Sequence, residues 1–389
     1  MSVLMLNKNT HLLSLKMDGT QVLEIEKVVN ERLLPFNLQG NNLTVENLNK
    51  WILKRLMGEK REGISKVKSD FPRFDQQECM FSLTDQYWFK RKHDQTWDDL
   101  NFFTNPYTEA VGKMFFSPWE VESDLIKGAS PDLTTNGILR KAWRRENGVN
   151  YLYKARGLSG KQQPISEVLA SLLLKMLDFL PFVEYELAIN GLTLCSKCAN
   201  FIDENTEFVP ASHIYYQRAR LMTDTRYTHF LKMCKLMDVD KTMSIKAIED
   251  YMDKMIAADK IIGNDDRHFG NFGFIRNVET GLITDFAPLF DSGSSFCKRD
   301  LKAEEEAKKM GKEKIIIFQD QEERALKKII EKYDLEKVID CKQMFHLIDR
   351  YPEISLEKKE EMKGQIKASI VNIKQLKSIV MQEKATTNG

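Results

Sequence analysis

The stretch Ile261–Phe296, IIGNDDRHFGNFGFIRNVETGLITDFAPLFDSGSSF, decides the fold, because it places a polar loop, a hairpin and a second polar loop in a recognisable order. Asp266 is followed five residues later by Asn271, and two short apolar runs with Gly281 between them come next. The sequence Asp291-Ser292-Gly293 ends the pattern.

Phosphoryl transfer from ATP requires this set of groups. One carboxylate accepts the hydroxyl proton, an amide on the same loop holds a metal ion, and a hairpin delivers a second carboxylate to the metal ions that bridge the phosphates. We therefore predict Asp266 as the catalytic base, with Asn271 and Asp291 as Mg²⁺ ligands. The spacing lets one tight loop present the first two side chains to a single pocket.

The pattern leaves some assignments open. Asp265 is an alternative to Asp266 as the base, and Asp285 is an alternative to Asp291 as the metal ligand. His268 is a second catalytic candidate, although its simplest role is that of a hydrogen-bonded histidine that organises the loop. Any one of these motifs occurs by chance in a polar loop, so the prediction depends on their joint order.

A hairpin and a helix are predicted upstream of this stretch. Ile138–Trp143 and Val149–Ala155 flank Asn147-Gly148, and Asn-Gly between strand-like runs is the strongest short hairpin signal. The apolar pattern that follows predicts a helix over Ser166–Phe179, with Ser166 as its N-cap.

A second hairpin and two longer helices come next. Val183–Ile189 and Leu192–Cys198 are joined by Asn190-Gly191, which predicts the hairpin. Helical periodicity then covers Ala219–Met237 and Ser244–Ile262. The order of a β-rich piece followed by a helical piece predicts an α+β protein with a two-lobed, protein-kinase-like fold.

A kinase also needs a strand lysine for the phosphates and a helix glutamate that positions it. Lys154 lies in the second strand of the first predicted hairpin, and Glu167 lies at the start of the next helix. We predict this pair as the ATP-binding residues, with Lys141 as the alternative lysine. The turn-rich approach Gly128–Gly137 could cover phosphates with backbone N–H groups, although it lacks the G-x-G-x-x-G spacing.

The N-terminal part of the chain is the hardest to interpret. A helix is predicted over Val45–Met57. The aromatic-rich stretch Phe81–Phe116 is interpreted as a small core or a surface packed on the next domain, with a substrate-docking surface as the alternative. We divide the chain into an N-terminal accessory region (1–125), a β-rich N-lobe (126–215) and a helical C-lobe (216–389). Within the C-lobe, the charged run Lys298–Lys314 is interpreted as a solvated loop or helix face.

Composition excludes several classes of protein. The 389 residues include 58 Lys plus Arg and 57 Asp plus Glu, a formal net charge of +1. A protein that binds nucleic acid through phosphate contacts is expected to be clearly basic, so we predict no direct nucleic-acid binding. The same balance gives no sign of a basic, membrane-facing surface.

Localisation and cysteine usage point to a reduced environment. The start of the chain lacks the order of a secretory signal, and the most apolar stretch, Val168–Leu180, is interrupted by Lys175 and Asp178. Cys195 and Cys198 form one C-x-x-C without a second pair, which is most simply two thiols at the end of a strand. We therefore predict a cytoplasmic protein without membrane association.

The central segment resembles the HipA-like kinase family, bacterial serine/threonine kinases best known as toxins of toxin–antitoxin pairs. Its members carry D-x-H-x-x-N in the catalytic loop, matched here by the six residues from Asp266 to Asn271. A proline-hydrophobic-aromatic-Asp segment follows, matched by Pro288-Leu289-Phe290-Asp291, and the resemblance covers roughly residues 130–350. It implies dependence on ATP and Mg²⁺, a protein substrate, and the same roles for Asp266, Asn271 and Asp291.

The resemblance also implies regulation. Some family members are inactivated when a serine of the phosphate loop is autophosphorylated, and Ser130, Thr134 and Thr135 are the candidate positions here. The family's partner is a small helix-turn-helix antitoxin. The loop of this chain is less rich in glycine than that of the best-known members.

Two alternatives to an active protein kinase stay open. One is a non-catalytic, kinase-shaped binding module, against which the complete set of Lys154, Glu167, Asp266, Asn271 and Asp291 argues. The other is a phosphoinositide-type lipid kinase, because such kinases also carry an Asp-Arg-His-x-x-Asn loop. The even charge balance disfavours the lipid kinase.

Overall fold

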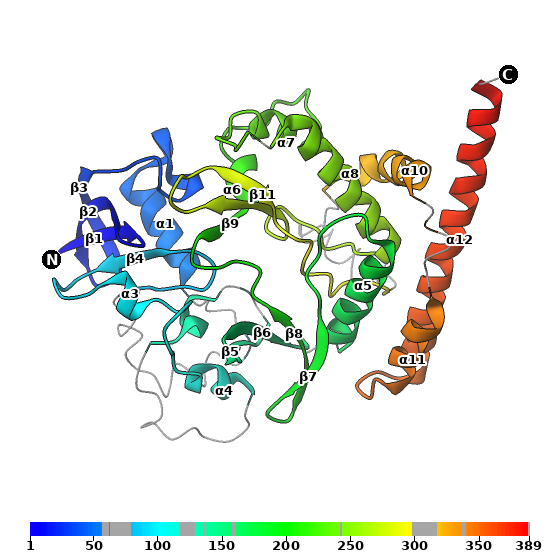
Figure 1. Cartoon of the computed structure of the whole chain (residues 1–389), viewed down its shortest axis with the longest axis horizontal. Helices are drawn as coiled ribbons and strands as arrows, with labels where there is room; N and C mark the ends of the chain where they lie inside the picture. The colour runs from blue at the N-terminus through cyan, green and yellow to red at the C-terminus, as the bar shows by residue number, and fades with distance from the viewer. Residues whose placement is uncertain are drawn as a thin grey trace.

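The part of the chain that the structure describes forms three antiparallel sheets and a set of helices (Figure 1). The computed structural model describes residues 1–56, 62, 79–116, 129–135, 137, 139–157, 161–241, 243–297, 317–333, 335 and 340–387. The predicted charged run Lys298–Lys314 lies outside the described residues, as does part of the loop approaching residue 140.

The first sheet forms one end of the molecule, with the strand order β3-β2-β1-β4 (Figure 1). Its strands are β1 (Ser2–Asn7), β2 (Thr10–Asp18), β3 (Gln21–Val28) and β4 (Tyr87–Lys90). Helix α1 (Val45–Arg55) buries Leu48, Trp51 and Ile52 in the core of this sheet. The predicted start of α1 at Val45 is confirmed, and the Thr44 side chain caps it by accepting from the Asn47 N–H at 3.1 Å.

The second sheet has the order β5-β6-β8-β7 and follows the two predicted hairpins. Its strands are β5 (Lys141–Glu146), β6 (Val149–Ala155), β7 (Glu186–Asn190) and β8 (Thr193–Ala199). Asn147 and Gly148 both have positive φ, 50° and 84°, as a type I′ turn requires, so the predicted hairpin and its turn are confirmed. Its first strand, predicted over Ile138–Trp143, runs instead over Lys141–Glu146. The strand predicted from Val183 begins only at Glu186.

Helix α5 (Gln163–Leu177) packs on this sheet and begins earlier than predicted. The prediction of Ser166 as N-cap is wrong, because Pro164 opens the helix and Ser166 lies inside its first turn. The Ser166 hydroxyl instead donates to the Ser295 carbonyl at 2.9 Å, which ties the helix to the segment after Asp291.

The third sheet, β11-β10-β9, carries the polar loops of the central stretch. Strand β9 (Thr206–Pro210) pairs with β10 (Gly273–Asn277), which forms the predicted hairpin with β11 (Ile283–Phe286). Helix α8 (Ile245–Ile262) confirms the prediction for Ser244–Ile262, with Ser244 as its N-cap. It ends at Gly263, whose φ of 65° is the left-handed conformation of a helix C-terminus.

The predicted helix Ala219–Met237 is wrong in its first half. The chain forms α6 (Ala211–Tyr215) and then turns until α7 (Arg226–Cys234), which Thr225 caps. The remaining longer helices lie at the far end of the molecule: α10 (Glu322–Lys332), α11 (Cys341–Arg350) and α12 (Leu356–Thr387). Helices α10 and α12 pack on α8, whereas α11 packs on α5 and α12. None of the described helices combines the length and apolar character needed to cross a membrane.

The aromatic-rich stretch packs against the second sheet, which confirms that interpretation. Phe81, Trp88, Trp97 and Phe102 form one buried cluster with Trp143 of β5. Two short helices belong to this region, α3 (Trp97–Leu100) and α4 (Ala110–Phe116), and α4 packs on β5. The short 3-10 turns are η1 (Phe36–Leu38), η2 (Gly40–Asn42), η5 (Pro131–Thr134) and η6 (Gln319–Gln321).

A buried ionic network joins the first sheet to the third. Arg276 of β10 is 1% exposed and donates to Glu207 of β9 at 2.8 Å and to the Tyr87 hydroxyl of β4 at 3.2 Å. Its other donors reach three carbonyl oxygens, those of Gly281 (2.9 Å), Leu34 (2.9 Å) and Arg32 (2.5 Å).

The N-terminal region also holds the segment that connects the second and third sheets. Gln86 donates to the carbonyl oxygens of Asp203 (2.7 Å) and Thr206 (2.6 Å), and Asn200 donates to the Leu83 carbonyl at 2.9 Å. The α+β, two-lobed architecture is confirmed, whereas the boundaries after residues 125 and 215 stay predictions.

Candidate active site

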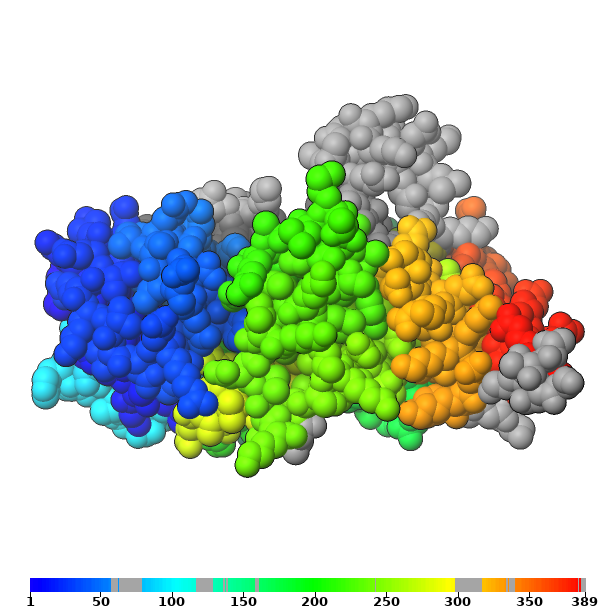
Figure 2. Space-filling model, turned by 90° about the horizontal axis from the view of Figure 1, so that it is seen from above, coloured from blue at the N-terminus to red at the C-terminus, as the bar shows by residue number. Residues whose placement is uncertain are grey.

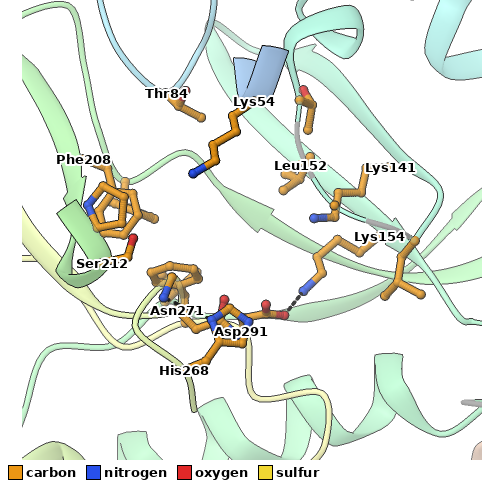
Figure 3. Close-up of a pocket in the computed structure, with 18 of the residues that line it drawn as sticks. Lys54, Thr84, Lys141, Leu152, Lys154, Phe208, Ser212, His268, Asn271 and Asp291 are labelled. Atoms are coloured by element: carbon orange, nitrogen blue, oxygen red, sulfur yellow. Dashed lines mark hydrogen bonds and ion pairs between the residues drawn. The ribbon is translucent and has the colours of Figure 1, made fainter. Parts of the chain in front are cut away.

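A cavity of about 1090 Å³ opens between the second and third sheets. Lys154, Glu167, Asp266, His268, Asn271 and Asp291 all line it, so the structure brings together every residue predicted from the sequence. Helix α1 of the N-terminal region forms a further part of the wall. Figure 3 shows Lys141 and Lys154 pointing into this cavity, with Asn271, His268 and Asp291 on its floor.

Lys154 is held between two carboxylates. It lies on β6 opposite Ser196 of β8, and its ammonium forms an ion pair with Glu167 of α5 and another with Asp291, at 2.6 Å. The Ser196 hydroxyl donates to the other Glu167 oxygen. Sequence spacing predicted the Lys154–Glu167 pair, and the fold adds Ser196 as the group that fixes Glu167.

Burial and charge act in opposite directions on these three groups. Burial alone would lower the pKa of Lys154, but the charges of Asp291 and Glu167 raise it well above its ordinary value. Burial raises the pKa of Glu167, against the effect of Lys154. For Asp291, burial is outweighed by Lys154 and then Lys141, which hold its pKa well below the ordinary range.

Arg267 organises the predicted catalytic loop, a role that sequence reasoning missed. Its guanidinium is buried and makes a two-pronged pair with Asp259 near the end of α8, with both N–O distances 2.9 Å. Its remaining NH1 hydrogens reach the carbonyl oxygens of Asn271 (2.7 Å) and Phe290 (2.6 Å). One side chain therefore links α8, the loop of Asp266 and the segment that delivers Asp291.

The geometry separates the candidates that the sequence left open. Asp266 lines the cavity, whereas Asp265 does not. Asp285 is exposed on β11 and lies outside the cavity lining, whereas Asp291 faces the cavity with a side chain that is 38% exposed. His268 is exposed, and its Nδ1 accepts from the Gly270 N–H at 3.0 Å, as a loop-organising histidine does.

Lys141 shares the cavity with Lys154. It lies directly opposite Lys154 across the β5–β6 hairpin, and its ammonium packs against Gly137. A Cβ on Gly137 would lie 2.4 Å from the Lys141 nitrogen, and the φ of this glycine is +111°. Only Lys154 pairs with Glu167, yet two cations line this side of the cavity.

The architecture matches that of a known toxin kinase. The HipA of the *Shewanella oneidensis* MR-1 toxin–antitoxin system, solved with HipB and operator DNA, aligns over 97% of this chain and 99% of that chain. The TM-score is 0.51 at 12% sequence identity. The chain has the HipA fold. The predicted resemblance is thus confirmed at the level of the fold.

A second solved structure also aligns. The *Helicobacter pylori* proinflammatory kinase CtkA covers 63% of this chain and 95% of its own length, with 19% identity and a TM-score of 0.49. No protein-family model and no curated protein matches the sequence.

The loop hydroxyls predicted as modification sites are buried in this version of the HipA fold. Thr134 donates to the Phe81 carbonyl at 2.7 Å, and Thr135 donates to the Pro131 carbonyl at 2.7 Å. Ser130 is fully buried next to Asp132. Phosphorylation at any of the three positions would therefore require the loop to leave its place.

The C-x-x-C pair is divided between the two faces of β8, as residues three apart in a strand must be. Cys195 packs beneath α4, whereas Cys198 lines the cavity. Burial raises the pKa of both thiols to about 12. The interpretation as two unlinked thiols is confirmed.

The donor set of the cavity suits Mg²⁺. The Asn271 Nδ2 faces the Asp266 carbonyl at 3.4 Å, which leaves its Oδ1 as an acceptor, and Asp291 adds a carboxylate. Mg²⁺ at a nucleotide site commonly takes one or two protein oxygens besides water and phosphate. No group of three or more His, Cys, Asp or Glu suited to a metal ion occurs among the described residues.

Proposed function

We propose that this chain is an ATP- and Mg²⁺-dependent serine/threonine protein kinase. The observation that carries the proposal is the placement of Lys154, held between Glu167 and Asp291, in the same cavity as Asp266 and Asn271. These are the parts that kinases use for phosphoryl transfer. The HipA fold supports the proposal.

Each residue has a role that follows from its position. Asn271 and Asp291 would hold Mg²⁺, which neutralises phosphate charge when bound. Lys154 would bind the α- and β-phosphates, with Glu167 and Ser196 as positioning residues. Asp266 would orient the substrate hydroxyl and accept its proton.

The test is the transfer of labelled γ-phosphate to proteins of a cell lysate. Asp266→Ala and Asp291→Ala are each expected to lower the rate by at least about 10²–10³. Circular dichroism and thermal melting should show that both variants stay folded. Full transfer in both folded variants would refute the assignment.

We also propose that the chain is the toxin of a toxin–antitoxin pair with a helix-turn-helix partner. The support is the HipA fold, because the *Shewanella* protein was solved with HipB and operator DNA. Expression of the chain should arrest growth, Asp266→Ala should restore growth, and co-expression of a small DNA-binding protein encoded beside it should do the same. Growth arrest that persists in Asp266→Ala would separate the toxicity from the kinase.

A further inference from the structure

The N-terminal region closes the cavity at the side opposite the catalytic loop. Lys54 of α1 lines the cavity, and Figure 3 shows it pointing inward across from Asn271 and His268. His213, Tyr216 and Gln217, from α6 and the turn after it, line the same part of the wall.

Hydrogen bonds and an ion pair fix this wall in place. Figure 2 shows the N-terminal region in blue against the green segment that contains α6 and α7. Asn42 donates to the Gln217 side chain at 3.1 Å, and Gln217 donates to the Phe36 carbonyl at 3.1 Å. Arg55, next to Lys54, is buried in an ion pair with Asp85. Lys54 is therefore presented from a rigid support.

The cations of α1 differ in what they bind. Arg55 donates to the carbonyl oxygens of Met80 (2.9 Å) and Tyr87 (2.8 Å), besides its pair with Asp85. Lys50 also lines the cavity, but its ammonium pairs with the exposed Glu46 at 2.5 Å. Lys54 forms no ion pair with any residue in the described ranges, although its side chain points into the cavity.

Helix α6, which forms the wall next to Lys54, carries no cation at pH 7. Burial, followed by the charge of Lys54, lowers the pKa of His213 to about 4, so this histidine is neutral at pH 7. The cations that face the phosphate side, Lys154 and Lys141, come from β5 and β6. The cations of the cavity lining thus lie on the N-lobe strands and on α1, where the carboxylate of Asp85 neutralises Arg55. The carboxylate of Glu62 lines the cavity as well.

We propose that Lys54 recognises a carboxylate of the protein substrate, so that the acceptor serine or threonine lies in an acidic segment. The inference rests on the proposed kinase function and names its substrate class. An acceptor hydroxyl at Asp266 leaves the adjoining residues of the substrate beside the α1 wall, where Lys54 points inward. Lys50 and Arg55 line the same wall but are paired with Glu46 and Asp85, whereas Lys54 forms no ion pair with a described residue. A carboxylate is the side chain that this ammonium pairs with best.

The test uses two short peptides with one serine each, flanked by glutamates in one and by glutamines in the other. The measured quantity is the ratio of kcat/KM for the acidic peptide to that for the neutral one. Wild type should favour the acidic peptide about fivefold, as expected for one ion pair near the surface, and less at high salt. The ratio should fall to about one in Lys54→Met and below one in Lys54→Glu.

The matched control is Lys27→Met, an equal change of charge at an exposed site of β3 outside the cavity. It should keep the wild-type ratio. A purely structural effect of the Lys54 variants would change both peptides alike and leave the ratio in place, which would overturn the inference. A ratio of one in wild type, or an acidic preference that survives in Lys54→Glu, would overturn it as well.

Two further readouts separate this inference from the proposed function. If wild type hydrolyses ATP with Mg²⁺ and Asp266→Ala does not, yet neither peptide is phosphorylated, the acidic-segment inference fails while the kinase assignment stands. Absence of both Mg²⁺-dependent ATP binding and hydrolysis would refute the proposed function itself, and the inference with it. Lys54-dependent binding of a single-stranded oligonucleotide in place of the acidic peptide also overturns the inference.

Discussion

Two buried ionic clusters of similar composition differ in how completely their donors are satisfied. In the cluster of Arg276, Glu207 and Tyr87, the cation is 1% exposed and each guanidinium nitrogen has a protein acceptor. In the cluster of Lys154, Glu167 and Asp291, the lysine is also buried, but the Asp291 side chain is 38% exposed toward the cavity.

The Arg276 cluster therefore stabilises the fold, whereas the Lys154 cluster keeps a carboxylate open to the cavity. Arg276 donates hydrogen bonds to three carbonyl oxygens and two side chains, which come from different segments of the chain. Asp291 keeps an open side although its positive neighbours hold its pKa low, so it stays ionised and available to a cation. The predictions below test this contrast.

The largest effect is expected for Arg276→Met. Loss of the cation leaves Glu207 buried without its partner, which should lower the free energy of unfolding by about 3–5 kcal/mol. The measurement is urea denaturation. Adding Glu207→Gln to the same chain should recover part of the loss, because the uncompensated charge is then removed. A double variant as unstable as the sum of both single variants would contradict this view of the cluster.

Lys154→Met should have its main effect on catalysis. Phosphate transfer should fall about 10²–10³-fold. Stability should fall less than in Arg276→Met, because the Asp291 side chain is 38% exposed toward the cavity and can be hydrated, and Glu167 keeps the hydrogen bond from Ser196. Steady-state kinetics and urea denaturation of the same preparation give both values.

Lys141→Met is the matched control for that variant, since it removes a cation from the same cavity without breaking the pair with Glu167. It should retain more activity than Lys154→Met. The reverse order would assign the phosphate-binding role to Lys141.

One carboxylate from each cluster, Asp291 and Glu207, should respond to acid in opposite directions. The folded pKa of Asp291 is lowered, so its stabilising contribution is complete above its ordinary pKa of about 4 and is lost as pH falls through the lowered value. The folded pKa of Glu207 is raised by burial, against the effect of Arg276, so its contribution is complete below its ordinary pKa and is lost as pH rises through the raised value.

Unfolding free energies at a series of pH values test this contrast. As pH falls toward about 4.5, the stability advantage of wild type over Glu207→Gln should grow and then level off. On further acidification below about pH 4, its advantage over Asp291→Asn should shrink. Parallel curves for the two variants would show that neither carboxyl titrates as described.

The smallest effect is expected for Asp285→Asn. Because Asp285 is exposed on β11 and outside the cavity, the variant should keep activity within about twofold and stability within about 0.5 kcal/mol of wild type. A loss of activity as large as that of Asp291→Ala would make Asp285 the better candidate for the metal ligand.

Local signals in the sequence predicted the elements that local interactions form. The Asn147-Gly148 turn and the capped helix α8 depend on residues within a few positions of one another, and both are confirmed. The first sheet was not predicted, because β1 pairs on one side with β4, a strand about 80 residues further along the chain. Ser166 was misread as a cap because its partner, the Ser295 carbonyl, lies 129 residues further along the chain.

The candidate site shows the same contrast between residues placed by local spacing and residues placed by long-range contacts. Sequence spacing was enough to predict that five residues share one site: Asp266, Asn271, Asp291, Lys154 and Glu167. The structure places all five at one cavity. Arg267 lies between two predicted residues but was given no role, since its partner Asp259 belongs to the preceding helix. Lys54 carries no signal at all, because only the fold brings α1 to the cavity.

The contacts of the N-terminal region have a consequence for motion. This region packs on Trp143 of the second sheet, bonds to the third sheet through Arg276, and holds the connecting segment through Asn200 and Gln86. The N-terminal region therefore links the two lobes and restrains their movement relative to each other. Opening of the lobes would strain all three attachments together, so a ligand should enter and leave the cavity through local movement at its mouth more than through wide hinge bending.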